Sequence, residues 1–316
     1  MNSITSGRHD PWPSNLVQGG QCHSGGVDRG LRMPLPRRGF LAGLGVLATA
    51  LRNPAFGRIG NVEIGVCVGS EDFENTVRYG FDYCEPDTSE IVTMDEARFA
   101  EFRAQVLASP IRCKSYRNFI RKLQVVGLNV SEKDLAAYMD RTLGLCQQLG
   151  GEVMVWGSSG SRNVPPGFSR DRAWQQIKDF LKLAGDVARR HQMVIAVEAL
   201  KHPDTNIINT VAEALRLVRE VNHPNVKMVV DFYHMRLEKE EPEIVWEARQ
   251  EIVHFHFANP AGRRWPHSVS EDADYYRRVF GLIKKIEFRR GLSIEGNGTF
   301  EADAAASLKF FAEMLG

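Results

Sequence analysis

Eight short apolar segments alternate with longer amphipathic segments from about residue 60 onward, and this alternation limits the fold more than any other feature. The apolar segments have the length and character of buried strands. They cover residues 62–67, 81–85, 111–113, 152–157, 194–198, 226–231, 252–256 and 292–295. The helix-length segments cover residues 95–109, 131–149, 170–191, 209–222, 241–250, 271–286 and 302–315. Strands and helices that alternate over roughly 250 residues predict an α/β protein with a single (β/α)8 TIM barrel.

An open, doubly wound sheet is the alternative α/β architecture. Such a sheet usually has a Gly-rich turn directly after its first strand. Here that turn reads Gly69-Ser70-Glu71-Asp72, which lacks the expected glycines. The sequence therefore favours the closed barrel.

The charge balance and the cysteines exclude several classes of function. The chain has 40 Lys and Arg residues against 39 Asp and Glu residues, which leaves no excess of positive charge for binding phosphate backbones. We therefore expect no nucleic-acid partner. The five cysteines include no CxxC pair, so a disulfide scaffold or a structural zinc site is not expected.

The region before the barrel has the pattern of an export signal. Arg37 and Arg38 precede a short, uncharged apolar run that ends at residues 48–50. Residues 33–50 therefore resemble a twin-arginine signal peptide, and the run is too short to span a bilayer. Residues 1–32 show no helical or strand period and are interpreted as a disordered extension or a mis-assigned start. This leaves residues 51–316 as the barrel. We expect export to the periplasm by the twin-arginine machinery, or a cytoplasmic location if the signal is not used.

Each of the last four predicted strands ends on a side chain that can bind a hard metal ion. These residues are Glu198, Asp231, His256 and Glu295. In a TIM barrel the C-terminal ends of the strands meet at one mouth, so these four side chains are expected to lie together there. Burying three unpaired carboxylates at one mouth is costly without a cation. The set thus predicts a site for a divalent metal ion such as Mn2+, Mg2+ or Co2+, and it is also compatible with Zn2+.

Several of these segments resemble motifs of one family, the xylose isomerase-like sugar phosphate isomerases and epimerases, which includes the ketose 3-epimerases. Residues 198–210 are similar to the family's fifth-strand region, and residues 157–168 to its fourth-strand loop. Asp231-Phe232-Tyr233-His234 is similar to its D-x-x-H motif, His254-Phe255-His256 to its H-x-H motif, and Ile294-Glu295-Gly296-Asn297 to its eighth-strand glutamate motif. The resemblance spans residues 61–316 and implies a xylose isomerase-like TIM barrel.

The resemblance also implies a reaction. It implies that Glu198, Asp231, His256 and Glu295 bind one divalent metal ion, with Mn2+ favoured over Mg2+, Co2+ and Zn2+. Glu198 and Glu295 would also act as an acid/base pair. They would move a proton through an enediolate of a ketose or a related polyol ketone, which gives isomerisation or epimerisation.

Three further residues are implied to bind this substrate, and the chain departs from the family around them. His234 would hydrogen-bond substrate oxygens, and Arg263 would be the family's substrate-binding arginine. Asp204 stands where epimerases of the family carry a glutamate. One extra residue lies between His256 and the Arg-x-x-Pro motif, which leaves Arg264 as an alternative to Arg263. The identity of the sugar or sugar derivative therefore stays open.

Other side chains of the same regions are expected to have structural roles. His254 is expected to point away from the metal, as a packed residue or as one that supports a ligand. Arg117 and Arg121 are expected on a solvated face.

Alternative functions remain on the same barrel. A metal-dependent lyase, a dehydratase or a C-glycoside-cleaving enzyme could pass through the same enolate. A non-catalytic relative that binds sugar without turnover is another alternative. A nuclease of the endonuclease IV type is disfavoured, because it needs a multi-zinc cluster and the first four predicted strands contain no histidine. Assembly into a homo-oligomer is left open.

Overall fold

The computed structural model describes residues 59–268 and 272–316, and within them parallel strands form one sheet. Its order is β3-β2-β1-β9-β8-β7-β6-β5-β4. The strands are β1 (Glu63–Cys67), β2 (Tyr83–Glu85), β3 (Arg112–Cys113), β4 (Ser115–Tyr116), β5 (Val153–Trp156), β6 (Val194–Glu198), β7 (Val226–Asp231), β8 (Ile252–Phe257) and β9 (Gly291–Ile294). The two ends of the order, β3 and β4, are separated in the chain only by Lys114. The sheet therefore closes into a nearly complete barrel in which β3 and β4 together form the third strand, which confirms the predicted fold.

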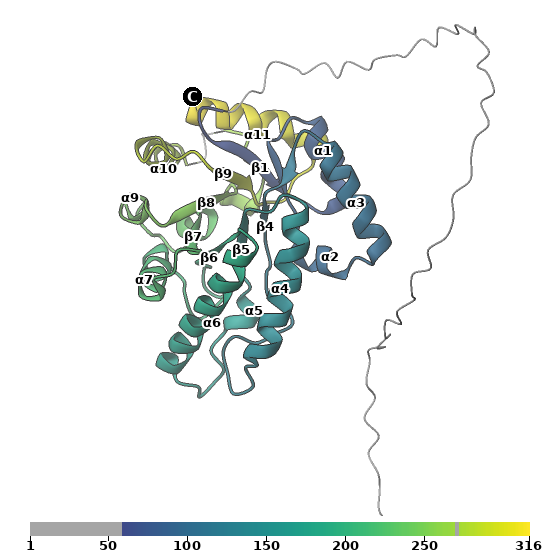
Figure 1. Cartoon of the computed structure of the whole chain (residues 1–316). Coiled ribbons are helices and arrows are strands. Elements are labelled where there is room, and N and C mark those ends of the chain that lie inside the picture. Colours follow the sequence, from purple (N-terminus) through teal and green to yellow (C-terminus); the bar gives the residue numbers. More distant parts are fainter. Residues whose placement is uncertain (1–58, 269–271) are drawn as a thin grey trace, which may run out of the picture. The chain divides into compact units, whose positions relative to one another are not determined.

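Helices surround the strands (Figure 1). The longer ones are α3 (Glu96–Ala108), α4 (Glu132–Gln148), α6 (Arg170–Arg190), α7 (Val211–Val221), α10 (Ala273–Lys285) and α11 (Phe300–Leu315). The shorter ones are α1 (Phe73–Arg78), α2 (Thr88–Thr93), α5 (Ser159–Arg162), α8 (Phe232–Leu237) and α9 (Ile244–Ala248), with two 3-10 turns at Ser70–Asp72 and Ala261–Arg263. Six of the predicted helices, at α3, α4, α6, α7, α10 and α11, lie within two residues of their predicted bounds at each end.

Side-chain caps mark where most of the long helices begin. Ser131, Ser169, Thr210 and Thr299 each accept a hydrogen bond from a backbone N–H in the first turn of α4, α6, α7 and α11. A short polar residue at this position satisfies a donor that the helix itself leaves unpaired. The helix starts are thus encoded locally.

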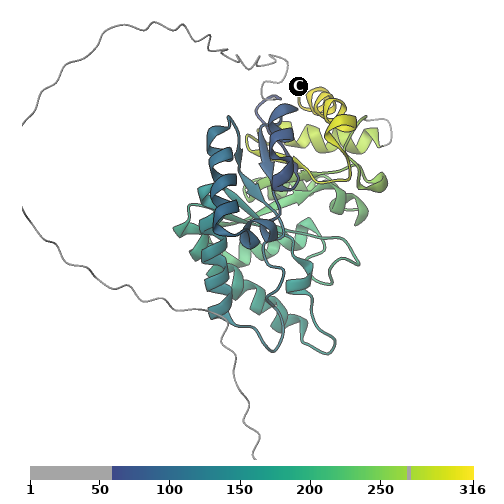
Figure 2. The same cartoon turned by 90° about the vertical axis from the view of Figure 1, so that its right-hand side faces the viewer.

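The first and last strands close the barrel. Strand β1 pairs in parallel with β9, and the ring of Phe81 lies 5.8 Å from that of Phe300 at the start of α11. In Figures 1 and 2 the yellow α11 accordingly lies beside the blue α1. Inside the barrel, Gly65 on β1 leaves room for the ring of Tyr83, because a Cβ atom there would lie 2.2 Å from that ring.

The predicted export signal at residues 33–50 and the predicted extension at residues 1–32 lie outside the described residues. Within residues 59–268 and 272–316, no helix combines the length and apolar character that a membrane span requires.

Candidate metal centre and active site

The four strand-end residues predicted as metal ligands come together at one mouth of the barrel. Glu198, Asp231, His256 and Glu295 each offer one ligand atom, and these atoms lie within 4.8 Å of one another. They come from β6, β7 and β8 and from the residue that follows β9. The Glu198, Asp231 and His256 side chains are buried, and that of Glu295 is 16% exposed. The strands therefore place all four donors in one small volume.

His256 lies between the carboxylates. Its Nδ1 atom is 3.1 Å from Glu198 Oε1 and 3.2 Å from Glu295 Oε2. Burial alone would lower the pKa of His256, but the charges of Glu85 and Glu295 outweigh burial and raise this pKa well above its ordinary value. Burial likewise opposes ionisation of Glu295, yet His256, Arg263 and Arg117 lower its pKa to about 2. The positive charges at the mouth therefore keep the Glu295 carboxylate ionised.

Only one of the two Asp231 carboxylate oxygens accepts a hydrogen bond. It ends β7 and caps α8, where its Oδ1 atom accepts hydrogen bonds from the backbone N–H groups of Tyr233 (2.7 Å) and His234 (3.4 Å). Its Oδ2 atom is buried and has no hydrogen-bond partner among the described residues. Burial, together with the charge of Glu295, raises the pKa of Asp231 to about 6. A buried carboxylate oxygen without a donor is costly, and a bound cation would remove that cost.

This arrangement fits a divalent cation. Two ligands on opposite sides of one metal ion lie about 4 to 5 Å apart, at twice the usual metal–oxygen distance of about 2.0–2.4 Å, and the four donor atoms meet this condition. Three carboxylates and one imidazole form a mixed oxygen and nitrogen set, which suits Mn2+, Co2+ or Mg2+ and is compatible with Zn2+. The unpartnered Asp231 Oδ2 atom is the observation that supports this fit.

Glu85 contacts His256 at its Nε2 atom, a role that we did not predict from the sequence. It ends β2 and is fully buried. Its Oε1 atom lies 2.9 Å from His256 Nε2, and its Oε2 atom accepts hydrogen bonds from Ser115 (2.6 Å) and Ser293 (2.5 Å). An acceptor at Nε2 fixes the proton there and leaves Nδ1 as the ligand atom. Glu85 follows the same pattern as the predicted ligands, a polar residue that ends an apolar strand.

We expected His254 to point away from the metal side, and this prediction is wrong. Its Nε2 atom lies 2.9 Å from Glu85 Oε2, and its ring lies 5.0 Å from that of His256. Residues two positions apart in a strand share a face, so His254 and His256 both point into the barrel. The other half of the expectation agrees with the structure, because His254 supports a ligand through Glu85.

Two of the predicted substrate-binding residues lie at the mouth. Arg263 donates from Nη2 to Glu295 Oε2 at 2.9 Å and lies 3.8 Å from Asp231 Oδ2, while its guanidinium lies over the ring of Tyr233. His234 Nδ1 accepts a hydrogen bond from the backbone N–H of Lys201, and its Nε2 atom lies 3.5 Å from Asp231 Oδ2. Burial lowers the pKa of His234.

Asp204 and Arg264, the other two candidates for substrate binding, each contact a residue outside the four predicted ligands. Asp204 pairs with Lys201 at 2.6 Å, and its side chain is 36% exposed. Asp204 is not part of the cluster that the four predicted ligands form. Arg264 donates from Nε to the carbonyl of Ala261, so Arg263 is the arginine of this loop that contacts Glu295.

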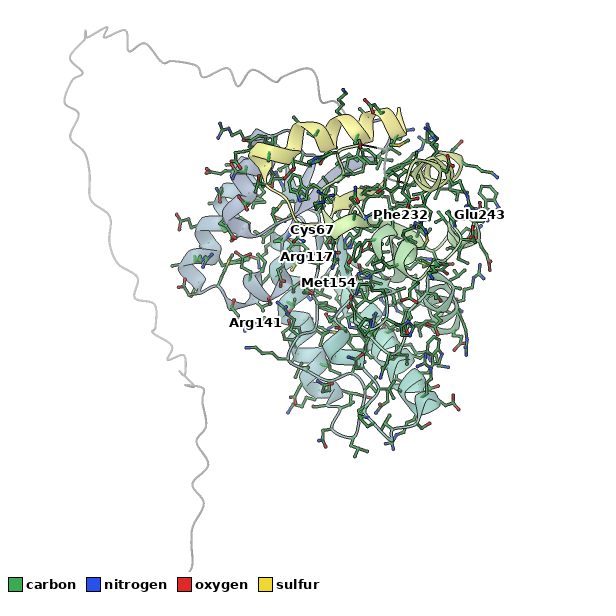
Figure 3. All side chains as sticks on the ribbon, turned by 180° about the vertical axis from the view of Figure 1, so that it is seen from behind. Cys67, Arg117, Arg141, Met154, Phe232 and Glu243 are labelled. Carbon is green, nitrogen blue, oxygen red and sulfur yellow. The ribbon has the colours of Figure 1, made fainter. Side chains whose placement is uncertain are left out.

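We expected Arg117 on a solvated face, and this prediction is wrong. It directly follows β4, and its Nη1 atom lies 3.7 Å from Glu295 Oε1. Figure 3 shows Arg117 close to Cys67 and Met154 in the middle of the barrel, whereas Arg141 and Glu243 lie at the periphery. Arg121 does match the expectation, because its side chain is 55% exposed and pairs with Asp87.

Arg162 fixes the backbone at the end of β6. It is fully buried and donates to the carbonyl of Glu198 at 2.7 Å and to that of Trp156 at 3.1 Å. Its guanidinium also lies over the Trp156 ring, 5.1 Å from the ring centre. Arg162 therefore ties the ends of β5 and β6 together and sets the position from which the Glu198 side chain extends.

Gly157 makes room for the Glu198 carboxylate, which yields a testable prediction. A Cβ atom at residue 157 would lie 1.8 Å from Glu198 Oε2, which forces that side chain to move. Gly157→Ala is therefore expected to weaken binding of divalent metal on the order of tenfold, measured by isothermal titration. Gly160→Ala is the matched control, because a Cβ atom there meets nothing within 4 Å. Equal metal affinity in both variants would contradict the placement of Glu198.

Comparisons with known proteins agree with this fold. A family model described as "Xylose isomerase-like TIM barrel" matches residues 73–314. The chain is 28% identical over 200 residues to a 3-dehydro-D-guloside 4-epimerase of Escherichia coli, an alignment that covers 60% of this chain and 73% of the relative. It is 24% identical over 242 residues to a probable ketose 3-epimerase of Synechocystis, which covers 72% of this chain and 79% of the relative.

Solved structures show the same fold. A crystal structure of an Escherichia coli 3-keto-D-glucoside 4-epimerase superposes with a TM-score of 0.66 at 23% identity, over 80% of this chain and 98% of that one. A D-psicose 3-epimerase of Clostridium cellulolyticum, solved with D-tagatose, gives a TM-score of 0.66 at 15% identity, over 80% and 96% of the two chains.

Proposed function

Because the chain belongs to the xylose isomerase-like TIM-barrel family, we propose that it is a divalent-metal-dependent epimerase or isomerase of a keto sugar or sugar derivative. The relatives named above are epimerases of such compounds, which supports an isomerase-type enzyme. The proposal assigns metal binding to Glu198, Asp231, His256 and Glu295.

One observation carries the proposal. The three carboxylates converge on the Nδ1 side of a single imidazole, and the buried Asp231 Oδ2 atom has no hydrogen-bond partner among the described residues. His234 at 3.5 Å and Arg263 at 3.8 Å make only ion-pair contacts with that oxygen, and neither donates a hydrogen bond to it. A site that binds a cation and a substrate leaves it available.

The side chains also supply proton transfer. A bound divalent cation would polarise the substrate carbonyl and make the neighbouring C–H group more acidic. Glu198 and Glu295 would then remove and return the proton, one at each step, through a planar enediolate. His234 and Arg263 would hold the substrate oxygens, since both lie within 4 Å of Asp231 Oδ2. Arg162 and Gly157 would keep the Glu198 carboxylate in place.

Exchange of substrate hydrogen with solvent tests this function. We expect the metal-loaded protein in D2O to incorporate deuterium next to the carbonyl of at least one keto sugar in a broad panel, detected by NMR and mass spectrometry. Exchange with no change in product mass other than deuterium supports an isomerase or epimerase. A dehydrated or cleaved product would point to the lyase or dehydratase alternative, and no exchange with any compound would contradict the proposed reaction.

A further inference from the structure

Arg117 and Arg263 lie near different oxygens of the candidate acid/base residue Glu295. Its Nη1 atom lies 3.7 Å from Glu295 Oε1, while Arg263 Nη2 lies 2.9 Å from Glu295 Oε2. The two arginines come from distant parts of the chain, one directly after β4 and the other from the turn at Ala261–Arg263. Glu295 therefore has a guanidinium at each of its oxygens.

The N–H groups of the Arg117 guanidinium make few contacts within the described part of the chain. Within the described part of the chain its guanidinium forms the 3.7 Å ion pair and no side-chain hydrogen bond, and its Nε atom is buried without a partner. An arginine carries five N–H donors in a planar fork, which matches a carboxylate or a phosphate. The Arg117 side chain is 28% exposed, so a ligand at the mouth can reach it.

The acidic groups around Arg117 each have a closer partner than Arg117. Glu198, Asp231 and Glu295 supply three negative charges, and a divalent cation together with Arg263 would balance them. Glu85 lies below this set and is paired with two histidines. Asp87, the other acidic group near Arg117, is already bonded by Asn118 at 2.6 Å and pairs with Arg121 at 3.4 Å. Arg117 therefore adds one positive charge that the protein itself does not pair closely.

We propose that Arg117 binds a carboxylate of the substrate, so that the preferred substrates are keto acids, such as keto sugar acids, and not neutral ketoses. This inference rests on the proposed function, because it takes Glu295 as the group that approaches the reacting carbon. Since Arg117 lies 3.7 Å from the same Glu295 carboxylate, a substrate carboxylate bound by Arg117 would lie close to the reacting carbon. A planar carboxylate fits the fork of one arginine, whereas a phosphate dianion would bring two negative charges beside Glu295.

Three small probes that share one hydroxyketone unit test this assignment on the metal-loaded protein. Dihydroxyacetone is neutral, hydroxypyruvate replaces one of its hydroxymethyl groups by a carboxylate, and dihydroxyacetone phosphate carries a phosphate. Isothermal titration of each probe gives an affinity ratio of hydroxypyruvate to dihydroxyacetone. We expect hydroxypyruvate to bind more tightly and Arg117→Met to reduce this ratio on the order of tenfold or more, because a charge-assisted hydrogen bond is lost. Arg117→Lys should keep part of the preference, since it retains the charge without the fork.

The controls separate this role from others. Arg121→Met removes a neighbouring exposed arginine and should leave the ratio unchanged. Metal content and melting temperature report whether each Arg117 variant keeps the fold and the metal site. An unchanged ratio in Arg117→Met, an equal loss for both probes, or no binding of hydroxypyruvate at millimolar concentration would overturn the proposal. A greater Arg117-dependent gain for dihydroxyacetone phosphate would replace the carboxylate by a phosphate and would also overturn it.

The outcomes are independent of the deuterium-exchange test. An Arg117-dependent preference for hydroxypyruvate without any exchange would remove the proposed reaction and keep the anion site. Exchange without that preference would keep the reaction and remove the substrate class.

Discussion

Glu85→Ala is expected to weaken the binding of divalent metal by about 10- to 100-fold and to destabilise the protein by about 3–5 kcal/mol. Glu85 is fully buried, and it accepts hydrogen bonds from His254 and His256 and from Ser115 and Ser293. Burial opposes its ionisation, but the two histidines lower its pKa well below the ordinary value. Removing the carboxylate takes away the acceptor that four buried donors share, although Ser293 keeps Tyr83 Oη at 2.7 Å, and it leaves His256 Nε2 without its partner. Metal titration and urea unfolding measure the two effects.

Two further variants show whether the effect comes from holding His256. Glu85→Gln keeps the size of the side chain, but its amide cannot accept from all four donors, so metal affinity should fall nearly as far as in the alanine variant. Ser115→Ala removes only one donor to the same carboxylate, and its cost should stay near 1 kcal/mol with unchanged metal affinity. Wild-type metal affinity in both Glu85 variants would show that His256 does not depend on Glu85.

Glu198→Gln and Glu295→Gln are each expected to slow deuterium exchange of an active keto sugar by about 10²- to 10⁴-fold, even when excess metal restores occupancy. An amide oxygen still binds metal weakly, but an amide cannot accept the substrate proton. Both residues lie within 3.2 Å of His256 Nδ1, so either change also weakens metal binding. The rates are therefore compared at saturating metal.

Asp231→Asn is the matched control for this pair. The proposal assigns Asp231 to metal binding and gives it no proton-transfer step. We expect its exchange rate to recover to within about tenfold of the wild-type rate once metal saturates the site, whereas the Glu198 and Glu295 variants stay slow. Full recovery of all three variants would mean that neither glutamate transfers the proton.

The barrel could be predicted from the sequence because each long helix carries a regular apolar face and each strand is a short apolar run. The third barrel strand is divided at Lys114 into β3 and β4. The predicted strand at residues 111–113 covers only the first of these two parts, because the apolar run ends there. The helices α1, α2, α5 and α8 span only four to six residues, which is too short for a helical period to be visible. Helix α8 begins where Asp231 caps it, so the same residue serves the fold and the candidate metal site.

The four candidate ligands could be predicted because a polar residue that ends a buried strand is unusual unless it has a role at the barrel mouth. Glu85 ends β2, and Arg117 follows β4 in the same manner, but a single residue of this kind gives no cluster in the sequence. Arg162 gives no signal at all. It lies in a short segment with Gly160 and Ser161, and only the folded chain shows that it is fully buried against Trp156.

The central claim is that Glu198, Asp231, His256 and Glu295 hold one divalent metal ion. The most direct test is the metal content of the purified protein by inductively coupled plasma mass spectrometry, beside the double variant Glu198→Gln/Glu295→Gln. We predict about one equivalent of Mn2+, Co2+, Mg2+ or Zn2+ per chain, which the double variant loses. No bound metal after incubation with all four ions, or two or three zinc equivalents that persist in the double variant, would contradict the account.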